Sequence, residues 1–264
     1  MASLQGTTVL VTGGAGGLGK VIATVYLEAG ANVAVCDVNE ERLSAAREEL
    51  GSAATTERFL AVQTDITDEE AVDALAADVV ARFGRLDILV NNAGIMDIFD
   101  PVGDLTKGRW DKVLAVNLTG SFLCMRAAVR AFEKQQPVGG TIIQIGSAAS
   151  NLGSCAGAAY TVSKHGVAGL VKNTADFYGD QGIYAVGLML GGMAETNIAD
   201  AAGGLGGFNR DAYARASAAR TFKPDEHSVP LRDVAKYCVF LADRSIAATA
   251  NGSCVPFNRN WPKA

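Results

Sequence analysis

The apolar positions of the chain fall into short runs that alternate with longer amphipathic stretches. Runs typical of buried strands stand at 7–12, 31–36, 59–64, 86–91, 141–146, 184–189 and 252–257. Helical patterns lie between them, near 17–29, 39–50, 68–83, 106–134, 155–179 and 231–243. Such alternation predicts a parallel sheet covered by helices on both faces. We therefore expect a single α/β domain over 1–264, built on a doubly wound parallel sheet of about seven strands.

A glycine-rich turn joins the first predicted strand to the first predicted helix, in TTVLVTGGAGGLGK. Gly13, Gly17 and Gly19 follow the strand, Leu18 opens the helix, and the next strand ends in Asp37. Glycines let the backbone approach a pyrophosphate, the helix N-terminus attracts it, and the acid accepts from a ribose hydroxyl. An isolated turn of this kind could be an ordinary helix cap. The order strand, turn, helix, strand and acid favours a dinucleotide site.

Tyr160 and Lys164 stand four positions apart in AAYTVSKHG, and Ser147 ends the apolar run TIIQIGS. Residues i and i+4 share one face of a helix, so the ammonium would lie beside the phenol. A positive charge there favours the tyrosinate and lowers the pKa of the phenol. Both residue types are also common on half-exposed helices, so the pair alone indicates little. Together with a dinucleotide site it indicates acid–base chemistry at Tyr160.

The glycine spacing after a threonine, Gly-x-x-x-Gly-x-Gly, together with these residues, resembles the short-chain dehydrogenase/reductase family. The resemblance runs in register from residue 7 to about 180, and it implies a single Rossmann-type domain that binds a nicotinamide dinucleotide. It continues through further positions that match the motifs of the family, which are Asp65, Ile66, Asn91, Asn92, Ala93, Gly94 and Asn117.

The resemblance implies a role for each of these positions. Asp65 and Ile66 would contact the adenine, and Asn92, Ala93 and Gly94 would line the cofactor site at a strand end. Lys164 would hold the nicotinamide ribose, and Thr196 would lie near the carboxamide. Taken singly, NNAG could be an ordinary turn.

Asn117 resembles the fourth catalytic member of the family. A mid-helix Asn can disturb the backbone and free a carbonyl for a water, giving a proton path to Lys164. By itself, Asn117 could equally be an exposed polar residue of a helix.

Hydride transfer between NAD(H) and a small, apolar secondary alcohol or ketone is the activity that the resemblance implies. Tyr160 would exchange the proton of the substrate hydroxyl, and Ser147 would stabilise charge on the substrate oxygen. Two alternatives stay open. One is an epimerase or dehydratase that oxidises its substrate transiently, and the other is a nucleotide-binding regulator without turnover.

NAD(H) is the expected cofactor rather than NADP(H). The carboxylate of Asp37 would bond a free ribose 2′-hydroxyl and repel a 2′-phosphate. In CDVNEER no basic residue follows before Arg42.

The C-terminal third departs from the pattern of the family. Tyr184, Val186 and Leu190 replace the usual Arg, Asn and Pro, and Gly191-Gly192 is expected to loosen the backbone further. The chain end carries Asn258-Arg259 where the family tends to have Asp-Gly.

A longer insert, at about 191–228, contains AAGGLGGFN and could be a mobile surface loop or, by the resemblance, a substrate lid. The expected pocket walls are largely apolar and comprise 95–99, 148–152, 192–194, Leu205 and Phe208.

Charge and composition narrow the range of partners. A net charge of −5 without a basic patch argues against nucleic acid. The start MASLQGTT has neither a basic nor an apolar leader region, and no run of about 18 uncharged apolar residues indicates a membrane span. Five scattered cysteines and two histidines lack metal-ligand spacing, so no metal is expected, and reduced thiols favour a cytoplasmic protein.

The helical segments 106–134 and 155–179 carry more apolar residues than one buried stripe needs. Residues of this surplus are Leu123, Met125, Val129, Phe132, Leu170 and Phe177. An exposed patch of that size favours association, and members of the family commonly pair these helices. We therefore expect a homotetramer, with a dimer as the second possibility.

Overall fold

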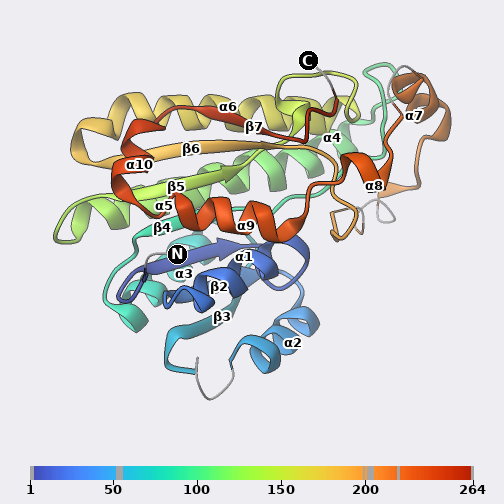
Figure 1. Ribbon diagram of the computed structural model, residues 1–264. Helices are drawn as coiled ribbons and strands as arrows, with labels where there is room; N and C mark the ends of the chain where they lie inside the picture. Colours follow the sequence, from blue (N-terminus) through green and yellow to red (C-terminus); the bar gives the residue numbers. More distant parts are fainter. Residues whose placement is uncertain (1–2, 52–55, 199, 201–204, 219–220, 263–264) are drawn as a thin grey trace.

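A parallel sheet of seven strands, in the order β3-β2-β1-β4-β5-β6-β7, forms the centre of the computed structural model (Figure 1). The structure describes residues 3–51, 56–198, 200, 205–218 and 221–262. The strands are β1 (Thr8–Thr12), β2 (Asn32–Asp37), β3 (Phe59–Gln63), β4 (Ile88–Asn91), β5 (Gly140–Ile145), β6 (Ile183–Leu190) and β7 (Cys254–Phe257). The predicted doubly wound, single-domain α/β fold is therefore confirmed.

Helices connect the strands and cover both faces of the sheet (Figure 1). The α-helices are α1 (Gly17–Glu28), α2 (Glu40–Leu50), α3 (Glu69–Phe83), α4 (Lys107–Leu114), α5 (Ser121–Lys134), α6 (Ala158–Tyr178), α7 (Arg210–Ser217), α8 (Pro224–His227), α9 (Leu231–Phe240) and α10 (Arg244–Thr249). The shorter segments are η1 (Thr56–Arg58), the π-helical turn η2 (Ala115–Gly120), η3 (Ala148–Ser150) and η4 (Gly179–Gln181).

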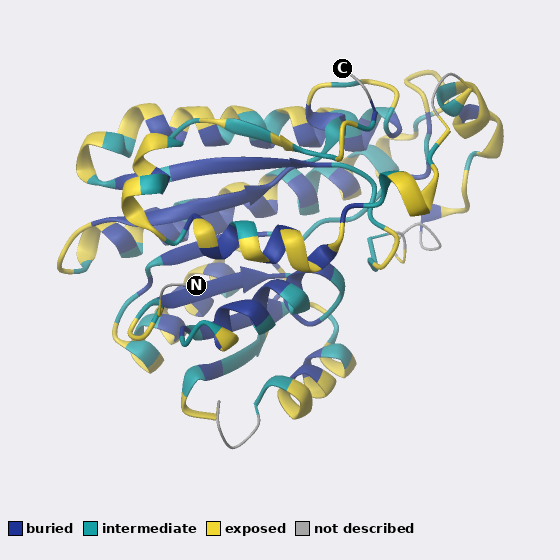
Figure 2. Ribbon diagram, in the orientation of Figure 1, coloured by how far each residue is buried: buried dark blue, intermediate teal, exposed yellow. Residues whose placement is uncertain are grey.

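Alternate residues of each strand enter two separate apolar cores, as the twofold periodicity of a strand requires. In β1, Val9 and Val11 pack in the core shared with α1 and α9, whereas Leu10 packs in the core shared with α3 and α5. The inner strands accordingly appear buried along most of their length, whereas the edge strands β3 and β7 are mostly half-buried (Figure 2). A third, smaller cluster around Tyr160 and Leu205 lies beyond the carboxyl ends of the strands.

The helical segment predicted at 106–134 is continuous but contains the π-helical turn η2 in its middle. By length and composition the run Lys107–Lys134 could cross a membrane, with a mean hydropathy of 1.3 in its most apolar window, and 56% of that window is buried inside the protein. Phe132 and Leu123 of α5 pack into the core beside α3, so contact with the sheet accounts for much of this apolar character.

Most of the apolar surplus expected on the outer faces of α5 and α6 is in fact inside the monomer. Leu123, Met125, Val129 and Phe132 are buried in the core, and Leu170 is half-buried against it. Of that group only Phe177 is largely exposed, at 73%. The expectation of a large surplus was wrong because packing in the core beside α3 buries more than one stripe of α5.

Two connections in the C-terminal third differ from the prediction. The insert expected at about 191–228 carries α7 and α8, and the described part of AAGGLGGFN begins at Leu205, which is buried. Residues 201–204 of that stretch lie outside the described residues. The helix expected at 231–243 is α9 and ends at Phe240, and a further helix, α10, follows where the sequence pattern predicted none. Asp243 caps α10 by accepting from the amide of Ser245 at 2.9 Å.

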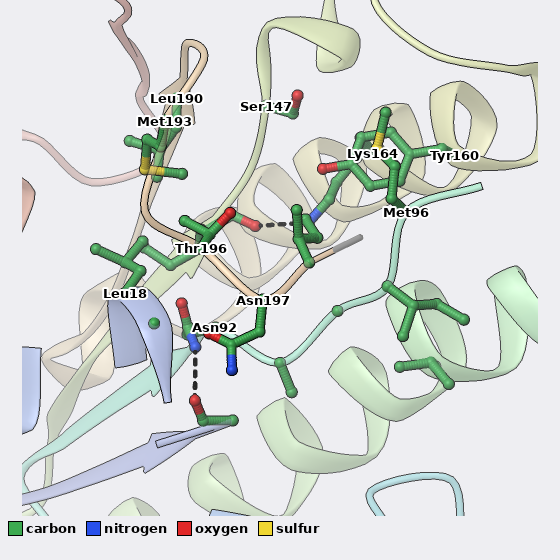
Figure 3. Close-up of a pocket in the computed structure, with 18 of the residues that line it drawn as sticks. Leu18, Asn92, Met96, Ser147, Tyr160, Lys164, Leu190, Met193, Thr196 and Asn197 are labelled. Atoms are coloured by element: carbon green, nitrogen blue, oxygen red, sulfur yellow. Dashed lines mark hydrogen bonds between the residues drawn. The ribbon is translucent and has the colours of Figure 1, made fainter. Parts of the chain in front are cut away.

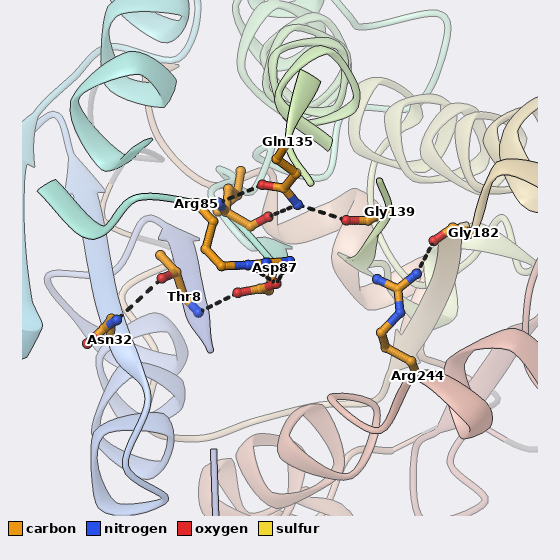
Figure 4. Close-up of polar contacts among 9 residues, drawn as sticks. Thr8, Asn32, Arg85, Asp87, Gln135, Gly139, Gly182 and Arg244 are labelled. Carbon is orange, nitrogen blue, oxygen red and sulfur yellow. Dashed lines mark hydrogen bonds and ion pairs between the residues drawn. The ribbon is translucent and has the colours of Figure 1, made fainter. Parts of the chain in front are cut away.

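Polar contacts fix the amino ends of the strands, on the edge of the sheet away from the glycine turn (Figure 4). Asp87 accepts from the amide of Thr8 at 2.9 Å and pairs with Arg85 at 2.7 Å. Gln135, at the end of α5, accepts from the amide of Leu86 at 3.1 Å and donates to the Gly139 carbonyl at 2.9 Å. These bonds hold the loops at the amino edge and leave the carboxyl edge free to form a site.

Candidate active site

The carboxyl ends of the strands open into one cavity of about 900 Å³ (Figure 3). It extends from the end of β2, at Asp37, past the glycine turn after β1 to Ser147, Tyr160 and Lys164. The cavity therefore lies where the strand order reverses between β1 and β4, which is the ligand-binding position of open α/β sheets.

The glycine turn is shaped for close contact between backbone and ligand. Gly13 and Gly17 adopt positive φ angles of 62° and 47°, which side chains disfavour, and both line the cavity. Helix α1 begins at Gly17 without a side-chain cap and without an acid in its first turn. Its N-terminal amides and partial positive charge suit an anionic pyrophosphate. Leu18 also lines the cavity.

Gly19 has a structural role rather than a lining one. A Cβ atom there would stand 2.1 Å from the Gly13 carbonyl oxygen and 2.7 Å from the Asn92 Nδ2 atom. The glycine thus allows α1 to pack against the turn. The residues of this region fit a dinucleotide, because a side chain at any of these three glycines would fill the cradle or displace its wall.

The far end of the cavity brings together the residues predicted to hold the adenosine half. Asp37, Asp65 and Ile66 all line it. Asp65 accepts from the amide and hydroxyl of Thr67 at 2.9 and 2.8 Å, so its carboxylate is fixed by the turn that follows β3. Asp37 accepts from the amide of Asn39 at 3.1 Å.

The stretch Asn92–Gly94 after β4 is tied to the end of β1. The amides of Asn92 and Ala93 donate to the Thr12 hydroxyl at 3.0 and 2.9 Å, and Asn92 Nδ2 donates to the Thr12 carbonyl at 2.9 Å. NNAG is therefore a cavity wall held by a neighbouring strand, and all three residues of 92–94 line the cavity. A Cβ atom on Gly94 would lie 3.3 Å from Asn117 Oδ1 and 3.7 Å from Lys164 Nζ.

Asn117 lies in the π-helical turn, is buried, and does not itself line the cavity. Its side chain accepts from the amide of Ile95 at 2.8 Å and donates to the Ile95 carbonyl at 2.9 Å and to Ser163 at 3.2 Å. Its own carbonyl accepts from the Ser121 hydroxyl at 2.8 Å. The Asn117 carbonyl thus carries one hydrogen bond, and the side chain of Asn117 fixes the wall beside Lys164.

Tyr160, Lys164 and Ser147 meet at the near end of the cavity, as predicted (Figure 3). Tyr160 and Lys164 are both buried in α6, with Lys164 Nζ 5.5 Å from the centroid of the phenol ring. Lys164 Nζ donates to the Ile145 carbonyl at 3.1 Å. Ser147 stands at the N-terminus of η3 after β5, where its hydroxyl accepts from the amide of Ala149 at 3.1 Å.

The pKa of Tyr160 is raised to about 12, opposite to the direction expected from the sequence. Burial is the largest cause, a hydrogen bond with Ser147 lowers the pKa, and the nearby Asp97 and Cys155 raise it. Burial also lowers the pKa of Lys164, to about 8. The sequence shows that the pair shares a helix face, but the desolvation that is the largest cause of both pKa shifts depends on the surrounding fold.

The segment after β6 is fixed by backbone contacts rather than loosened. The amide of Gly191 donates to the Phe257 carbonyl at 3.1 Å, and the Gly192 carbonyl accepts from the amide of Val229 at 2.9 Å. A Cβ atom at Gly192 would stand 2.3 Å from the Phe222 ring. These glycines are needed because the chain end and the insert pack directly on them. Thr196 lines the cavity, as predicted.

The predicted apolar wall is only partly right. Residues 95–96, Ala148 and 192–193 line the cavity, whereas Phe208 packs on Phe99 at a ring distance of 5.3 Å. The wall is completed by residues that the sequence did not indicate, which are Cys155, Asn197, Tyr213, Phe222, Trp261 and Pro262. Trp261 comes from the chain end and packs on Phe222 and His227 at 4.8 and 5.4 Å. No local pattern marks these residues, because they reach the cavity through contacts between distant segments.

Among the described residues, the cysteines and acids form neither a disulfide nor a candidate metal site. The five cysteines form no disulfide with one another. Among the residues that the structure describes, no group of three or more His, Cys, Asp or Glu side chains is placed to hold a metal ion.

Comparisons with known proteins match this chain to dehydrogenases and reductases. Residues 7–203 match the family described as short chain dehydrogenase. The chain is 42% identical to the short chain dehydrogenase/reductase dpchG of Colletotrichum higginsianum, over 98% of this chain and 94% of that protein. It is 34% identical to 3beta-hydroxysteroid dehydrogenase 2 of Eggerthella lenta, over 98% of this chain and 95% of that protein. The crystal structure of levodione reductase superposes with a TM-score of 0.84 at 28% identity, covering 97% of this chain and 98% of that one.

Proposed function

The chain belongs to the short-chain dehydrogenase/reductase family, and on that premise we propose that it transfers hydride between NAD(H) and an apolar secondary alcohol or its ketone. The family binds a nicotinamide cofactor, so the open questions are which one and which substrate. The observation that carries the proposal is the single cavity that joins Asp37 and the glycine turn to Ser147, Tyr160 and Lys164.

In this proposal a nicotinamide bound in the cavity would supply or accept the hydride, and side chains of the protein transfer the proton. The phenolic oxygen of Tyr160 takes the proton from the substrate hydroxyl in oxidation and returns it in reduction. The hydroxyl of Ser147 bonds the substrate oxygen and stabilises its developing charge. Lys164 holds the ribose hydroxyls with its ammonium. Asn117 positions the wall at Ile95 and does not touch the substrate.

Asp37 supports NAD(H) over NADP(H). Its carboxylate lines the cavity at the end of β2, where it would accept from a 2′-hydroxyl and repel a 2′-phosphate. Arg42 also lines this end, but its guanidinium pairs with Asp200. A 2′-phosphate would therefore have to break that pair before it gained a positive partner.

The walls around Tyr160 support an apolar substrate. Met96, Leu190, Met193, Phe222 and Trp261 line the cavity, and they offer no charge to grip a phosphate or an acid. The similarity to a hydroxysteroid dehydrogenase agrees with a ring-bearing secondary alcohol. We also propose that the residues 191–228 act as the substrate lid, because Met193, Thr196 and Phe222 of this insert face the cavity. A cytoplasmic location is proposed from the reduced cysteines.

A panel of secondary alcohols and ketones, assayed with both nicotinamides by the absorbance of the reduced cofactor, tests this function. Cyclic, uncharged substrates should react, and kcat/KM with NAD(H) should exceed that with NADP(H) by at least about tenfold, or about 1.4 kcal/mol. Asp37→Ser should lower the ratio of kcat/KM with NAD(H) to kcat/KM with NADP(H), because it removes the repulsion of the 2′-phosphate. A wild-type enzyme that works better with NADPH would show the Asp37 assignment to be wrong. Product formation without any net change in cofactor absorbance would instead indicate transient oxidation.

A further inference from the structure

Two buried acids, Asp97 and Asp100, stand in the loop that follows Asn92–Gly94, with 4% and 3% of their surfaces exposed. Asp97 falls within the predicted pocket wall 95–99 and Asp100 just beyond it, but neither acid lines the cavity. Their partners differ. Asp97 faces the first turn of α6, and Asp100 faces α4 and the insert after β6.

Asp97 binds the backbone of the helix that carries Tyr160. Its Oδ1 atom accepts from the amides of Gly157 and Phe99 at 3.0 Å each, and its Oδ2 atom accepts from the amide of Tyr160 itself at 3.0 Å. The amide of Ala158 donates to the Asp100 carbonyl at 2.9 Å. A Cβ atom at Gly157 would stand 2.5 Å from Asp97 Oδ2, so the loop and the helix end are in close contact. The loop thus bonds the amides of Gly157, Ala158 and Tyr160 at the N-terminus of α6.

The opposite side of the same loop holds the insert. Asp100 pairs with Arg109 at 2.7 Å and accepts from Asn209 Nδ2 at 3.1 Å. Arg109 in turn donates to the Leu205 carbonyl at 2.8 Å. Phe99 has a positive φ of 66°, and its ring meets Tyr213 of α7 at 5.0 Å. A bulky residue keeps such a backbone only where its surroundings impose it.

We propose that Asp97 is a positioning residue for Tyr160, because its carboxylate accepts from the amides of Gly157 and Tyr160 and so fixes the first turn of α6. The proposal deepens the function given above and rests on it. A negative charge near a phenol disfavours the tyrosinate, so the charge of Asp97 raises the pKa of the Tyr160 phenol and keeps it protonated to higher pH. The raised pKa of Tyr160, to which Asp97 contributes after burial, agrees with this direction. Asp100 is the matched residue: it is equally buried, in the same loop, but serves the insert.

The charged and titratable groups that face Tyr160 come from three elements. They are Lys164 of the same helix, Cys155 of the segment before it, and Asp97 of the loop after β4. Replacing Asp97 by Asn keeps the size of the side chain, removes the charge, and puts an amide donor against the amide of Gly157 or Tyr160. Asp97→Glu keeps the charge. Asp100→Asn removes an equally buried charge that faces Arg109.

The decisive measurement is the pH dependence of kcat/KM for alcohol oxidation with NAD⁺, using the best alcohol of the panel. Loss of the negative charge lowers the pKa of Tyr160, so the alkaline rise in rate should move to lower pH in Asp97→Asn by at least about half a pH unit. Asp97→Glu should restore the position of the wild-type rise. Asp100→Asn should keep that position and raise KM instead. The proposal would be overturned if the alkaline rise of kcat/KM stayed at the same pH in Asp97→Asn. It would also be overturned if that rise moved by the same amount in Asp100→Asn.

A second readout needs no turnover. Hydrogen exchange of the amides at 157–161 reports whether the first turn of α6 stays closed. Exchange should accelerate by about tenfold or more in Asp97→Asn and much less in Asp100→Asn. Equal exchange in the wild type and Asp97→Asn would refute the anchoring role. If no alcohol or ketone turned over, the proposed function would fail by itself, while this measurement would still decide whether Asp97 holds the helix.

Discussion

Burial, more than their mutual contact, determines the protonation of Tyr160 and Lys164. Both side chains are enclosed by the third apolar cluster and the walls of the cavity, and burial is the largest cause of both shifts. Burial disfavours the charged form of each, which raises the pKa of the phenol and lowers that of the ammonium. Each group is therefore neutral over a wider pH range than in water. Ligands that bring hydroxyls and charge into the cavity would reverse part of this effect.

Tyr160→Phe should reduce kcat by about 10²–10⁴-fold, because it removes the group that exchanges the proton. Affinity for NAD(H), measured by quenching of protein fluorescence, should change little, since the ring and Lys164 remain. Tyr237→Phe is the control, because that ring packs between Phe240 and Phe257, outside the cavity. A Tyr160→Phe enzyme that kept more than about a third of kcat would remove Tyr160 from the proposed mechanism.

Lys164 should make the stability of the protein depend on alkaline pH. Its pKa falls from 10.5 to about 8 in the folded chain, so between these values the unfolded state binds more protons than the folded state. The free energy of unfolding contributed by this group therefore rises as pH increases from about 8 to 10.5. Urea denaturation of the wild type and Lys164→Met across this range should show the wild type gaining stability relative to the variant. A difference in the free energy of unfolding between the two proteins that stayed constant across this pH range would contradict the lowered pKa of Lys164.

At the scale of elements, two backbone irregularities shape the site. The first is the glycine turn before α1, which the sequence indicates directly. The second is the π-turn η2, which interrupts a helix that the sequence predicts as continuous, and which places Asn117 against Ile95. A π-turn inserts one residue into a helix, and such turns are frequent at functional sites. Here it carries the side chain of Asn117, which is buried, as is that of Ser121 four residues later.

Gly19→Ala should weaken NAD(H) binding by about tenfold or more and lower the melting temperature, because an added Cβ would collide with the Gly13 carbonyl at 2.1 Å. The oxygen belongs to the backbone and the Cβ position is set by the backbone of residue 19, so no side-chain rotation relieves the collision. Gly108→Ala in α4 is the matched control, since its Cβ would meet no atom within 4 Å, and it should stabilise the helix by up to about 1 kcal/mol. Calorimetric titration and thermal melts measure both effects. Unchanged affinity in Gly19→Ala would show that the turn tolerates a shift of α1.

At the scale of the whole molecule, the outer faces of α5 and α6 are the surfaces on which we propose assembly. Phe122, Val162 and Phe177 are exposed there, although most of the neighbouring apolar residues are buried within the monomer. The proposal of a homotetramer therefore rests on these few exposed side chains and on the pairing of these helices that is common in the family. It does not rest on a large apolar patch. A dimer through the same helices is the next possibility.

Light scattering at micromolar concentration should report a mass of about four times the 27.3 kDa chain. The double variant Phe122→Glu/Val162→Glu should lose the tetramer, because two charges would be buried at the interface. Val102→Glu, at an exposed position in the loop before α4, should leave the mass unchanged. A wild-type mass of 27.3 kDa would exclude the proposed assembly.

Local patterns in the sequence determined the order of strands and helices, the glycine turn and the Tyr160–Lys164 face. These features depend on residues close together in the chain, whose spacing reflects the period of a strand or a helix. The edge of the sheet at which Asp37, Asn92 and Ser147 line the cavity also followed, because parallel strands bring their carboxyl ends to one edge.

Only the tertiary structure decided how the cavity closes and how its acid–base group is held. Trp261 and Phe222 reach the cavity from the chain end and the insert, and Asp97 reaches the amide of Tyr160 from a loop 63 residues earlier in the chain. Neither contact has a periodic signal, because each depends on where whole elements pack. The direction of the Tyr160 pKa shift could not be predicted either. The sequence places a lysine near the phenol, but the burial that is the largest cause of the raised pKa depends on the fold.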